Sequence, residues 1–210
     1  MSILLLCLKM LLSKLPSRTK FMAATKKTDN SNFDGKLLLR RHFLDLYPPH
    51  SVLDCCQGGK KIWGKLLKDY PVKYLGVDVK PKKGRLQVDS TKILGQPGWD
   101  YDVIDIDTYG SPWRHWQNAL KFAPGDVTIF LTIGLVKIMG GGLCREVMEW
   151  LGFKKFHPPI PTSLAAKCSD LALPYALDRA RRAGFQIELV LEAPRSKNAR
   201  YLGVRLHKCL

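Results

Sequence analysis

The 210-residue sequence is poor in acidic side chains and lacks the short motifs of several common kinds of site. It has 18 Asp and Glu residues against 34 Lys and Arg residues, which gives a net charge of +16. Six cysteines occur, but none form a CxxC pair and no Cys/His cluster has zinc spacing, so we expect no metal site. Because buried free thiols are typical of a reducing compartment, this pattern favours a cytoplasmic protein.

Apolar runs long enough to span a bilayer are also lacking. One candidate, residues 3–12, is interrupted by Lys9, and no clear cleavage site of small residues follows it. Met22 begins a polar segment that reads as a natural start, so we expect residues 1–35 to be a disordered or loosely attached extension. An acid-poor organelle presequence is the alternative. We expect residues 36–210 to form one domain, with no membrane partner.

The positive charge is not confined to this extension. Residues 31–210 still hold 28 basic and 17 acidic side chains, a net charge of +11. A folded domain this basic usually meets a polyanion, and nucleic acid is the commonest one. We therefore expect RNA or DNA as the partner, although a charge that serves only solubility is the alternative.

Apolar runs alternate with helix-like segments from residue 36 onward. Near-continuous apolar runs are typical of parallel strands covered on both faces, and their alternation with helices indicates βαβ units. The predicted strands are 51–56, 74–79, 85–89, 101–107, 126–136, 185–193 and 199–207. The predicted helices are 36–47, 60–69, 113–122, 140–153 and 170–183. The pattern predicts an α/β fold with a mainly parallel, seven-stranded sheet and a C-terminal antiparallel hairpin.

Acidic residues lie at the ends of the first three predicted strands. An open parallel sheet binds its ligand beyond these carboxyl ends. Asp54 precedes a glycine turn, which lets backbone N–H groups approach a ligand. Asp78 can accept hydrogen bonds from both hydroxyls of a ribose, and Asp89 with Ser90 can bind an adenine amino group. Taken alone, a plain strand-to-helix turn is the alternative for the loop after Asp54, and a helix cap or a surface acid is the alternative for Asp78.

Two nucleotide-binding motifs are absent at this edge. The turn at 55–59, CCQGG, has no third glycine and is not GxGxxG, and the phosphate-binding motif GxxxxGK[ST] does not occur. These absences disfavour a nicotinamide dehydrogenase and a phosphate-binding NTPase. After the fourth strand comes a turn that combines acids and an aromatic residue, DIDTYGSP at 105–112.

The order of strands and motifs resembles that of the class I S-adenosylmethionine-dependent methyltransferases, which have a Rossmann-like fold, over about residues 50–207. The DIDTYGSP segment resembles the DPPY-type motif of amino-methyltransferases. It is more similar to the D-x-D-P-F-G-S-P signature of tRNA guanine-N2 dimethyltransferases, over eight residues. The resemblance implies S-adenosylmethionine as the cofactor. It also implies methylation of an exocyclic amine of a nucleic-acid base, with RNA favoured over DNA.

The resemblance also implies roles for individual residues. Asp54 and Gly58 would line the methionine side of the cofactor, Asp78 would hold the ribose, and Asp89 the adenine. The implied cofactor-binding residues are Asp54, Cys56, Gln57, Gly58, Asp78, Asp89 and Ser90. The implied catalytic residues are Asp107, Thr108 and Tyr109. Thr108 replaces the proline of the family motif, and this departure leaves the amine specificity open.

The chemistry expected of the last three residues follows from the reaction. Methyl transfer is an in-line displacement at a sulfonium carbon, so the protein mainly aligns nucleophile, methyl group and sulfur. A base amine is a poor nucleophile because its lone pair is delocalised into the ring. Asp107 and the Thr108 carbonyl can accept its hydrogens and stabilise the developing positive charge, and Tyr109 can stack on the base. Core packing is the alternative for Tyr109.

Other features leave alternatives open. Lys60, Lys61 and the basic residues of 80–85 either line the rim of the cleft or form a solvated loop, and residues 137–168 are a candidate substrate-side insertion. His115 is a candidate for the substrate side or a packed histidine. The alternative functions are a small-molecule or protein methyltransferase and a non-catalytic nucleic-acid-binding protein with a decayed fold. The irregular turns favour the decayed fold, whereas the set of four acids, Asp54, Asp78, Asp89 and Asp107, argues against it.

Overall fold

The computed structural model describes six stretches of the chain. These are residues 32–80, 86–108, 111–134, 149–152, 162–194 and 199–209, without the side chains of 162–169. The chain divides into two units, Met1–Asn30 and Ser31–Leu210, and all of the described residues belong to the second. Within these stretches, no helix combines the length and the apolar character that a membrane crossing requires.

Seven strands form one sheet in the order β3-β2-β1-β4-β5-β7-β6. The first five strands pair in parallel, whereas β7 pairs antiparallel with both β5 and β6. The strands are β1 (Ser51–Asp54), β2 (Lys73–Asp78), β3 (Leu86–Gln87), β4 (Val103–Ile106), β5 (Val127–Gly134), β6 (Phe185–Glu192) and β7 (Ala199–Lys208). This arrangement confirms the predicted parallel α/β sheet that ends in an antiparallel hairpin. In this hairpin, β7 pairs with β5, and β6 forms the edge of the sheet.

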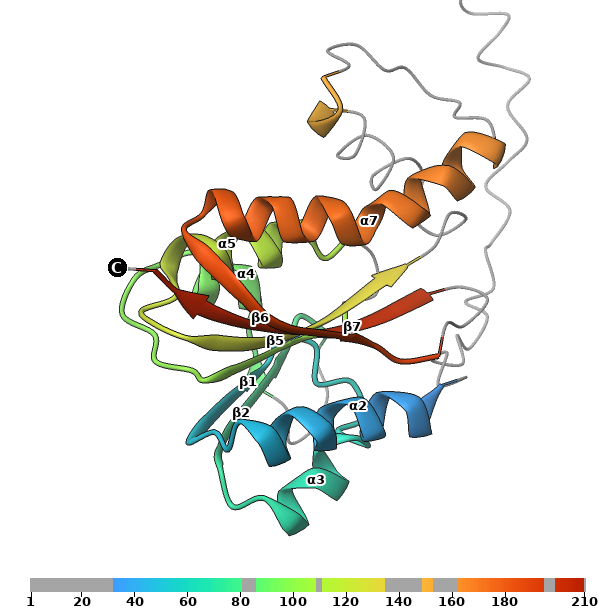
Figure 1. Ribbon diagram of the computed structural model, residues 1–210. Helices are drawn as coiled ribbons and strands as arrows, with labels where there is room; N and C mark the ends of the chain where they lie inside the picture. Colours follow the sequence, from blue (N-terminus) through green and yellow to red (C-terminus); the bar gives the residue numbers. More distant parts are fainter. Residues whose placement is uncertain are drawn as a thin grey trace, which may run out of the picture. The chain divides into compact units, whose positions relative to one another are not determined.

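Helices cover both faces of this sheet (Figure 1). Helices α4 (Ser90–Leu94), α5 (Trp113–Phe122) and α7 (Thr162–Arg182) lie on one face. Helices α2 (Phe33–Leu46) and α3 (Trp63–Asp69) lie on the other. The central strands are buried between these layers, as their apolar sequences predict: every residue of β4 is buried, and all of β5 except Gly134.

Several elements differ from the sequence prediction. Helix α7 begins at Thr162, eight residues before the predicted start, and it continues through Pro174. Helix α4 was not predicted, because five residues are too short to display apolar periodicity. Strand β3 has two residues rather than five, and residues 81–85 before it lie outside the described ranges. Most of the predicted helix 140–153 lies outside them as well.

Helix α2 is packed against β5 and β7 through Phe43. This side chain is fully buried, and its ring meets that of Phe130 edge-on, with centroids 5.6 Å apart. Gly203 in β7 makes room for it, because a Cβ atom there would collide with the Phe43 ring. The packing leaves the first turns of α2 close to the carboxyl ends of the parallel strands, where Lys36 and Arg40 contact residues of β4 and the turn after it.

Candidate functional site

The loop that follows β1 joins the ends of several strands. The N–H of Cys55 donates to the carbonyl oxygen of Asp105 in β4, and the N–H of Gln57 donates to that of Val77 in β2, both at 2.9 Å. The Ser90 hydroxyl, at the start of α4, donates to the carbonyl oxygen of Cys55 at 2.9 Å. The carboxyl ends of β1, β2 and β4 are thus fixed relative to one another at the edge where parallel sheets bind ligands.

Asp78 closes the glycine turn. The N–H of Gly58 donates to Oδ2 of Asp78 at 3.1 Å, and the N–H of Lys80 donates to Oδ1 at 2.9 Å. Gly58 has a φ of 51°, which a glycine adopts without strain, and Lys60 has a φ of 54°, which is uncommon for a residue with a side chain. A carboxylate oxygen can accept more than one hydrogen bond, so these contacts are compatible with the predicted ribose contact.

Asp54 is buried at the end of β1, where it accepts a hydrogen bond from the hydroxyl of Tyr74 at 2.7 Å. Burial and the neighbouring carboxylate of Asp105 raise the pKa of Asp54 to about 7, although Tyr74 and Arg40 act in the opposite direction. Asp54 therefore changes its charge near neutral pH. A cationic group bound beside it would favour the ionised form.

Three of the predicted acids act electrostatically on Cys56. Burial and the carboxylates of Asp54, Asp107 and Asp78 all raise the pKa of the Cys56 thiol. Its neighbours Cys55 and Gln57 donate backbone hydrogen bonds to β4 and β2, so Cys56 lies where the ends of β1, β2 and β4 meet. The thiol stays protonated at physiological pH and forms a neutral wall of the site rather than a nucleophile. Within the described ranges, no group of three or more His, Cys, Asp or Glu side chains could hold a metal ion.

Asp89 and Ser90 make structural contacts. Oδ1 of Asp89 accepts hydrogen bonds from the backbone N–H and the hydroxyl of Thr91, at 2.9 and 2.7 Å, and so caps α4. The Ser90 hydroxyl also meets Nε2 of His115 at 2.8 Å, and burial lowers the pKa of that imidazole. The cap at Asp89 was not predicted from the sequence. Its predicted role at the adenine remains a prediction.

At the end of β4, Asp105 forms an enclosed ion pair with helix α2. Nε and Nη2 of Arg40 donate to its two oxygens at 2.8 and 2.7 Å, and Nε1 of Trp63 donates to Oδ2 at 2.6 Å. These contacts fasten β4 to α2 and α3 directly before the candidate catalytic acid.

Asp107, predicted as the catalytic acid, forms an ion pair with Lys36 of helix α2. The Lys36 ammonium donates to Oδ1 and Oδ2 of Asp107 at 2.9 and 2.8 Å, and the Asp107 side chain is 29% exposed. Burial acts to raise the pKa of Asp107, but the opposite charges of Lys36 and Arg40 outweigh it and lower the pKa. The same ammonium lies 4.4 Å from the centre of the Tyr201 ring.

The two other predicted catalytic residues follow Asp107. Oγ1 of Thr108 is buried, and among the described residues it has no hydrogen-bond partner. Tyr109 lies outside the described residues, as do Lys82, Lys83 and Arg85. The stacking role of Tyr109 therefore remains a prediction.

Sequence reasoning missed Lys36 and Arg40, although a signal was present. The buried residues of α2 are Lys36, Leu39, Arg40, Phe43 and Leu44, a stripe at helical spacing. Two cations inside an apolar stripe require buried partners of opposite charge, because an unpaired buried charge is very costly. The acids of β4 and of the turn after it were the natural candidates for these partners.

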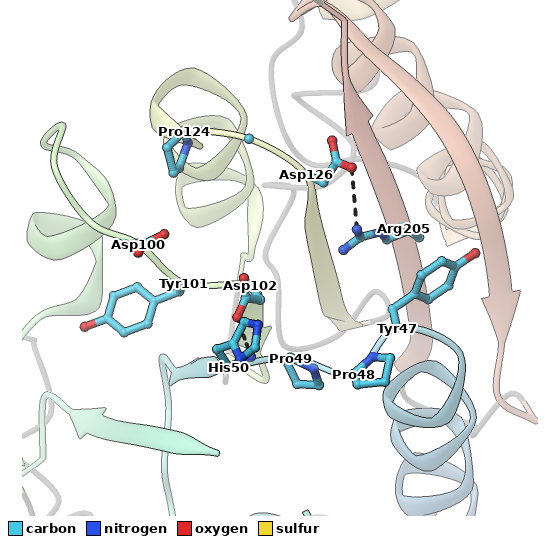
Figure 2. A pocket seen from close by; sticks show the side chains of 11 residues that line it. Tyr47, Pro48, Pro49, His50, Asp100, Tyr101, Asp102, Pro124, Asp126 and Arg205 are labelled. Carbon is cyan, nitrogen blue, oxygen red and sulfur yellow. Dashed lines mark hydrogen bonds and ion pairs between the residues drawn. The ribbon is translucent and has the colours of Figure 1, made fainter. Parts of the chain in front are cut away.

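A pocket of about 530 Å³ lies at the amino ends of the parallel strands, opposite the predicted site (Figure 2). It is lined by Tyr47, Pro48, Pro49, His50, Asp100, Tyr101, Asp102, Pro124, Gly125, Asp126 and Arg205, most of which directly precede β1, β4 or β5. Asp102 accepts hydrogen bonds from the N–H groups of His50 and Ser51, and Asp126 accepts one from that of Lys208. Asp102 thus joins the starts of β1 and β4, whereas Asp126 joins the start of β5 to the end of β7. No residue of the predicted site lines this pocket.

Comparisons with known proteins agree with this architecture. No family model matches the sequence, and no curated protein matches it. Among solved structures, the chain is similar to Trm1 from Pyrococcus horikoshii, determined with S-adenosyl-L-methionine, with a TM-score of 0.59 and 15% identity. The similarity covers 84% of this chain, which spans about half, 54%, of that protein. It is also similar to M. jannaschii TYW2 in complex with AdoMet, with a TM-score of 0.51, 8% identity and coverage of 83% and 77% of the two chains.

The strand order, together with these neighbours, decides the architecture. The fold is that of the class I methyltransferases. Asp54 and Asp78 are the last residues of β1 and β2, and Asp107 directly follows β4, so all three lie at the carboxyl ends of adjacent parallel strands.

Proposed function

We propose that the chain is an S-adenosylmethionine-dependent methyltransferase acting on an exocyclic amine of a nucleic-acid base, with RNA favoured over DNA. The observation that carries the proposal is the position of Asp54, Asp78 and Asp107 at the carboxyl ends of β1, β2 and β4, which are adjacent and parallel. A set of carboxylates at the ends of three adjacent strands is a costly arrangement, because like charges repel. A bound ligand with positive charge and hydroxyl donors would offset the repulsion between these carboxylates.

The residues present fit the cofactor. Its ammonium and sulfonium groups are cationic and would lie beside Asp54, which titrates near pH 7 and would ionise on binding. Its ribose hydroxyls can donate to Asp78, and the open backbone at Gly58 allows close approach. When bound, S-adenosylmethionine supplies a methyl group on an electrophilic carbon. The two similar structures from Pyrococcus and M. jannaschii both contain this cofactor, which supports the same assignment here.

The residues of the turn after β4 support a base amine as the nucleophile. Asp107 is an oriented carboxylate at the rim of the site, and the carbonyl of Thr108 follows it. These acceptors can hold the amine hydrogens and stabilise the charge that develops on nitrogen. The net charge of +11 over residues 31–210 favours a nucleic-acid substrate, and the resemblance of DIDTYGSP to the signature of tRNA guanine-N2 dimethyltransferases favours RNA.

The test combines cofactor binding with methyl transfer. Calorimetry with S-adenosylhomocysteine should detect binding, and tritiated S-adenosylmethionine should label unmodified tRNA transcripts more than DNA of matched sequence. Asp107→Asn should lower kcat about 10²–10³-fold while leaving cofactor affinity within about twofold. Asp100→Asn is the matched control, since Asp100 is exposed at the opposite edge of the sheet and should leave both quantities unchanged.

Three outcomes would count against the proposal. Absence of cofactor binding by the wild type would favour the decayed, non-catalytic fold. Label that enters a protein or a small molecule in preference to RNA would favour the other class of substrate. Full activity of Asp107→Asn would remove the catalytic role assigned to that acid.

A further inference from the structure

The ion pair between Lys36 and Asp107 joins a helix that precedes the sheet to the candidate catalytic acid. The Lys36 side chain is 7% exposed, and its ammonium bridges both carboxylate oxygens. On its other side lies the ring of Tyr201. Lys36 is therefore not a mobile surface lysine but a buried cation held at the substrate end of the site.

The backbone of α2 fixes the position of this ammonium. Nη1 of Arg40 donates to the carbonyl oxygen of Lys36 at 3.0 Å, and the same guanidinium pairs with Asp105. One turn later, Phe43 packs against β5 and β7. The helix thus presents two cations, four residues apart, to two acids that are two residues apart on β4 and the turn after it.

We propose that Lys36 is a positioning and selectivity residue, which holds Asp107 as an oriented carboxylate and favours, as the methyl acceptor, a neutral planar amine over an alkylamine that reaches the site as its ammonium. This inference rests on the proposed function, in which Asp107 receives the substrate amine. It assigns the preference to a residue that lies 71 positions away in the sequence and outside the resembling motif.

Positioning follows from the hydrogen bonds that Asp107 accepts. A carboxylate offers about four acceptor sites, of which Lys36 occupies two, so acceptor capacity remains for one amine hydrogen. Among the described residues, the cations that act on Asp107 are Lys36 and Arg40 from α2, and the Cys56 thiol on the loop after β1 is neutral. The two cations keep the carboxylate ionised despite its burial.

Selectivity follows from the charge of the pair. Lys36 already neutralises Asp107, so a protonated alkylamine would find no uncompensated carboxylate and would approach a second ammonium. Two like charges a few ångströms apart repel strongly where water is scarce. A base amine carries no charge before transfer, and it needs only the remaining acceptor site.

The first experiment measures the acid directly, without cofactor or substrate. Carboxyl carbon NMR of the full chain would give the pKa of Asp107 in the wild type, in Lys36→Met and in Lys36→Arg. We expect the Met variant to raise this pKa by about 1–3 pH units and the Arg variant to keep it low. Lys121→Met is the matched control, because Lys121 is an exposed lysine of α5 that lies over the ring of Phe122.

The second experiment measures methyl transfer to an unmodified tRNA transcript and to polylysine. Lys36→Met should lower kcat on RNA about tenfold at pH 7 and move the acidic limb of its pH profile upward. It should also raise the ratio of polylysine to RNA labelling at least about tenfold. Lys36→Arg should restore most of the wild-type behaviour, and Lys121→Met should retain all of it. Affinity for S-adenosylhomocysteine reports whether each variant is folded.

The outcomes separate the two proposals. An unchanged pKa of Asp107 in Lys36→Met, or an unchanged pH profile and labelling ratio in an active enzyme, would overturn the role of Lys36 while the proposed function stands. A wild type that binds no cofactor and labels no RNA would overturn the proposed function itself. A raised pKa with a lower, shifted pH profile and a higher labelling ratio supports the inference.

Discussion

The side chains of Arg40 and Asp105 form a bidentate ion pair, with N–O distances of 2.8 and 2.7 Å, and each is only 3% exposed. Trp63 adds a third hydrogen bond to the same carboxylate at 2.6 Å. Asp105 precedes Asp107 by two residues on the chain. The pair therefore sets the position of helix α2, and of the lysine that the helix carries, against the strand end that holds the candidate catalytic acid.

Removal of Arg40 should destabilise the fold. Arg40→Met would leave Asp105 buried without its counter-charge, and we expect the free energy of unfolding to fall by about 3–5 kcal/mol. The double variant Arg40→Met/Asp105→Asn should recover much of this loss, because Asn removes the charge and still accepts from Trp63. Urea unfolding measures both.

The adjacent arginine provides the control for this comparison. Arg41 pairs with Asp69 at 2.6 Å, but the two side chains are 44% and 52% exposed. Solvent screens such a pair, so Arg41→Met should lower the free energy of unfolding by no more than about 1 kcal/mol. Equal losses of unfolding free energy in Arg40→Met and Arg41→Met would show that the buried ion pair contributes no more to stability than the exposed one.

Asp54 should make the stability of the free protein fall as the pH rises. The pKa of Asp54 is raised to about 7 by burial and by Asp105, from an ordinary value of 3.8. The unfolded chain therefore loses this proton at lower pH than the folded chain does. The stabilisation from protonated Asp54 is complete below about pH 4, declines between pH 4 and 7, and is lost above pH 7.

The Asn variant tests this linkage. Asp54→Asn cannot ionise, so its free energy of unfolding should gain on that of the wild type by about 2–4 kcal/mol between pH 4.5 and pH 8, since each pKa unit corresponds to about 1.4 kcal/mol. Urea unfolding at five or six pH values would measure the difference. A constant difference across this range would mean that Asp54 titrates normally in the fold.

The sheet was predictable because its signal is local. Strands β1, β4 and β5 are apolar runs that any buried parallel strand requires, and helix α5 has the predicted bounds, Trp113–Phe122, because Pro112 precedes it and Pro124 follows it closely. The order of the acids along the chain also predicted which of them share an edge. Because parallel strands run in the same direction, their carboxyl ends all lie on the same side of the sheet.

The contacts across the layers were not predictable in the same way. Lys36 and Asp107 are 71 positions apart, and their pairing depends on how α2 packs across the sheet. Helix α4 is too short for a periodic pattern, so Asp89 could equally be read as a cap or as a ligand group. The cap is the contact observed. Local sequence identifies an acid at a strand end but not the partner that occupies it.

Binding of nucleic acid should depend steeply on salt. This expectation rests on the net positive charge of positions 31–210, which hold 28 basic and 17 acidic residues. Each phosphate that the protein neutralises should contribute about −0.9 for duplexes, or about −0.7 for single strands, to the slope of log K against log salt. Fluorescence anisotropy with labelled tRNA and DNA from about 50 to 200 mM salt gives this slope. A flat response would exclude a phosphate-binding surface. Asp107→Asn should leave the slope unchanged, because that acid is assigned to the base and not to the backbone.

Thr108→Val should improve the stability of the free protein and weaken its activity. Oγ1 of Thr108 is buried and lacks a partner among the described residues, although buried hydroxyls are normally hydrogen-bonded. Valine has the same shape without the hydroxyl, so we expect the free energy of unfolding to rise by up to about 1 kcal/mol. If the hydroxyl donates to the bound substrate or cofactor, kcat/KM for tRNA should fall about 5–10-fold, the equivalent of one neutral hydrogen bond.

The matched control for this substitution is Thr128→Val. Thr128 is 1% exposed in β5, and its hydroxyl accepts from Nη1 of Arg205 at 3.4 Å, at the edge of the sheet opposite the site. This variant should lose stability and keep its kcat/KM. A Thr108→Val protein that is more stable and fully active would show that the hydroxyl has no ligand. A Thr108→Val protein that is less stable than the wild type would show that the Thr108 hydroxyl forms a hydrogen bond within the fold, because loss of an unpaired buried hydroxyl should not destabilise the protein.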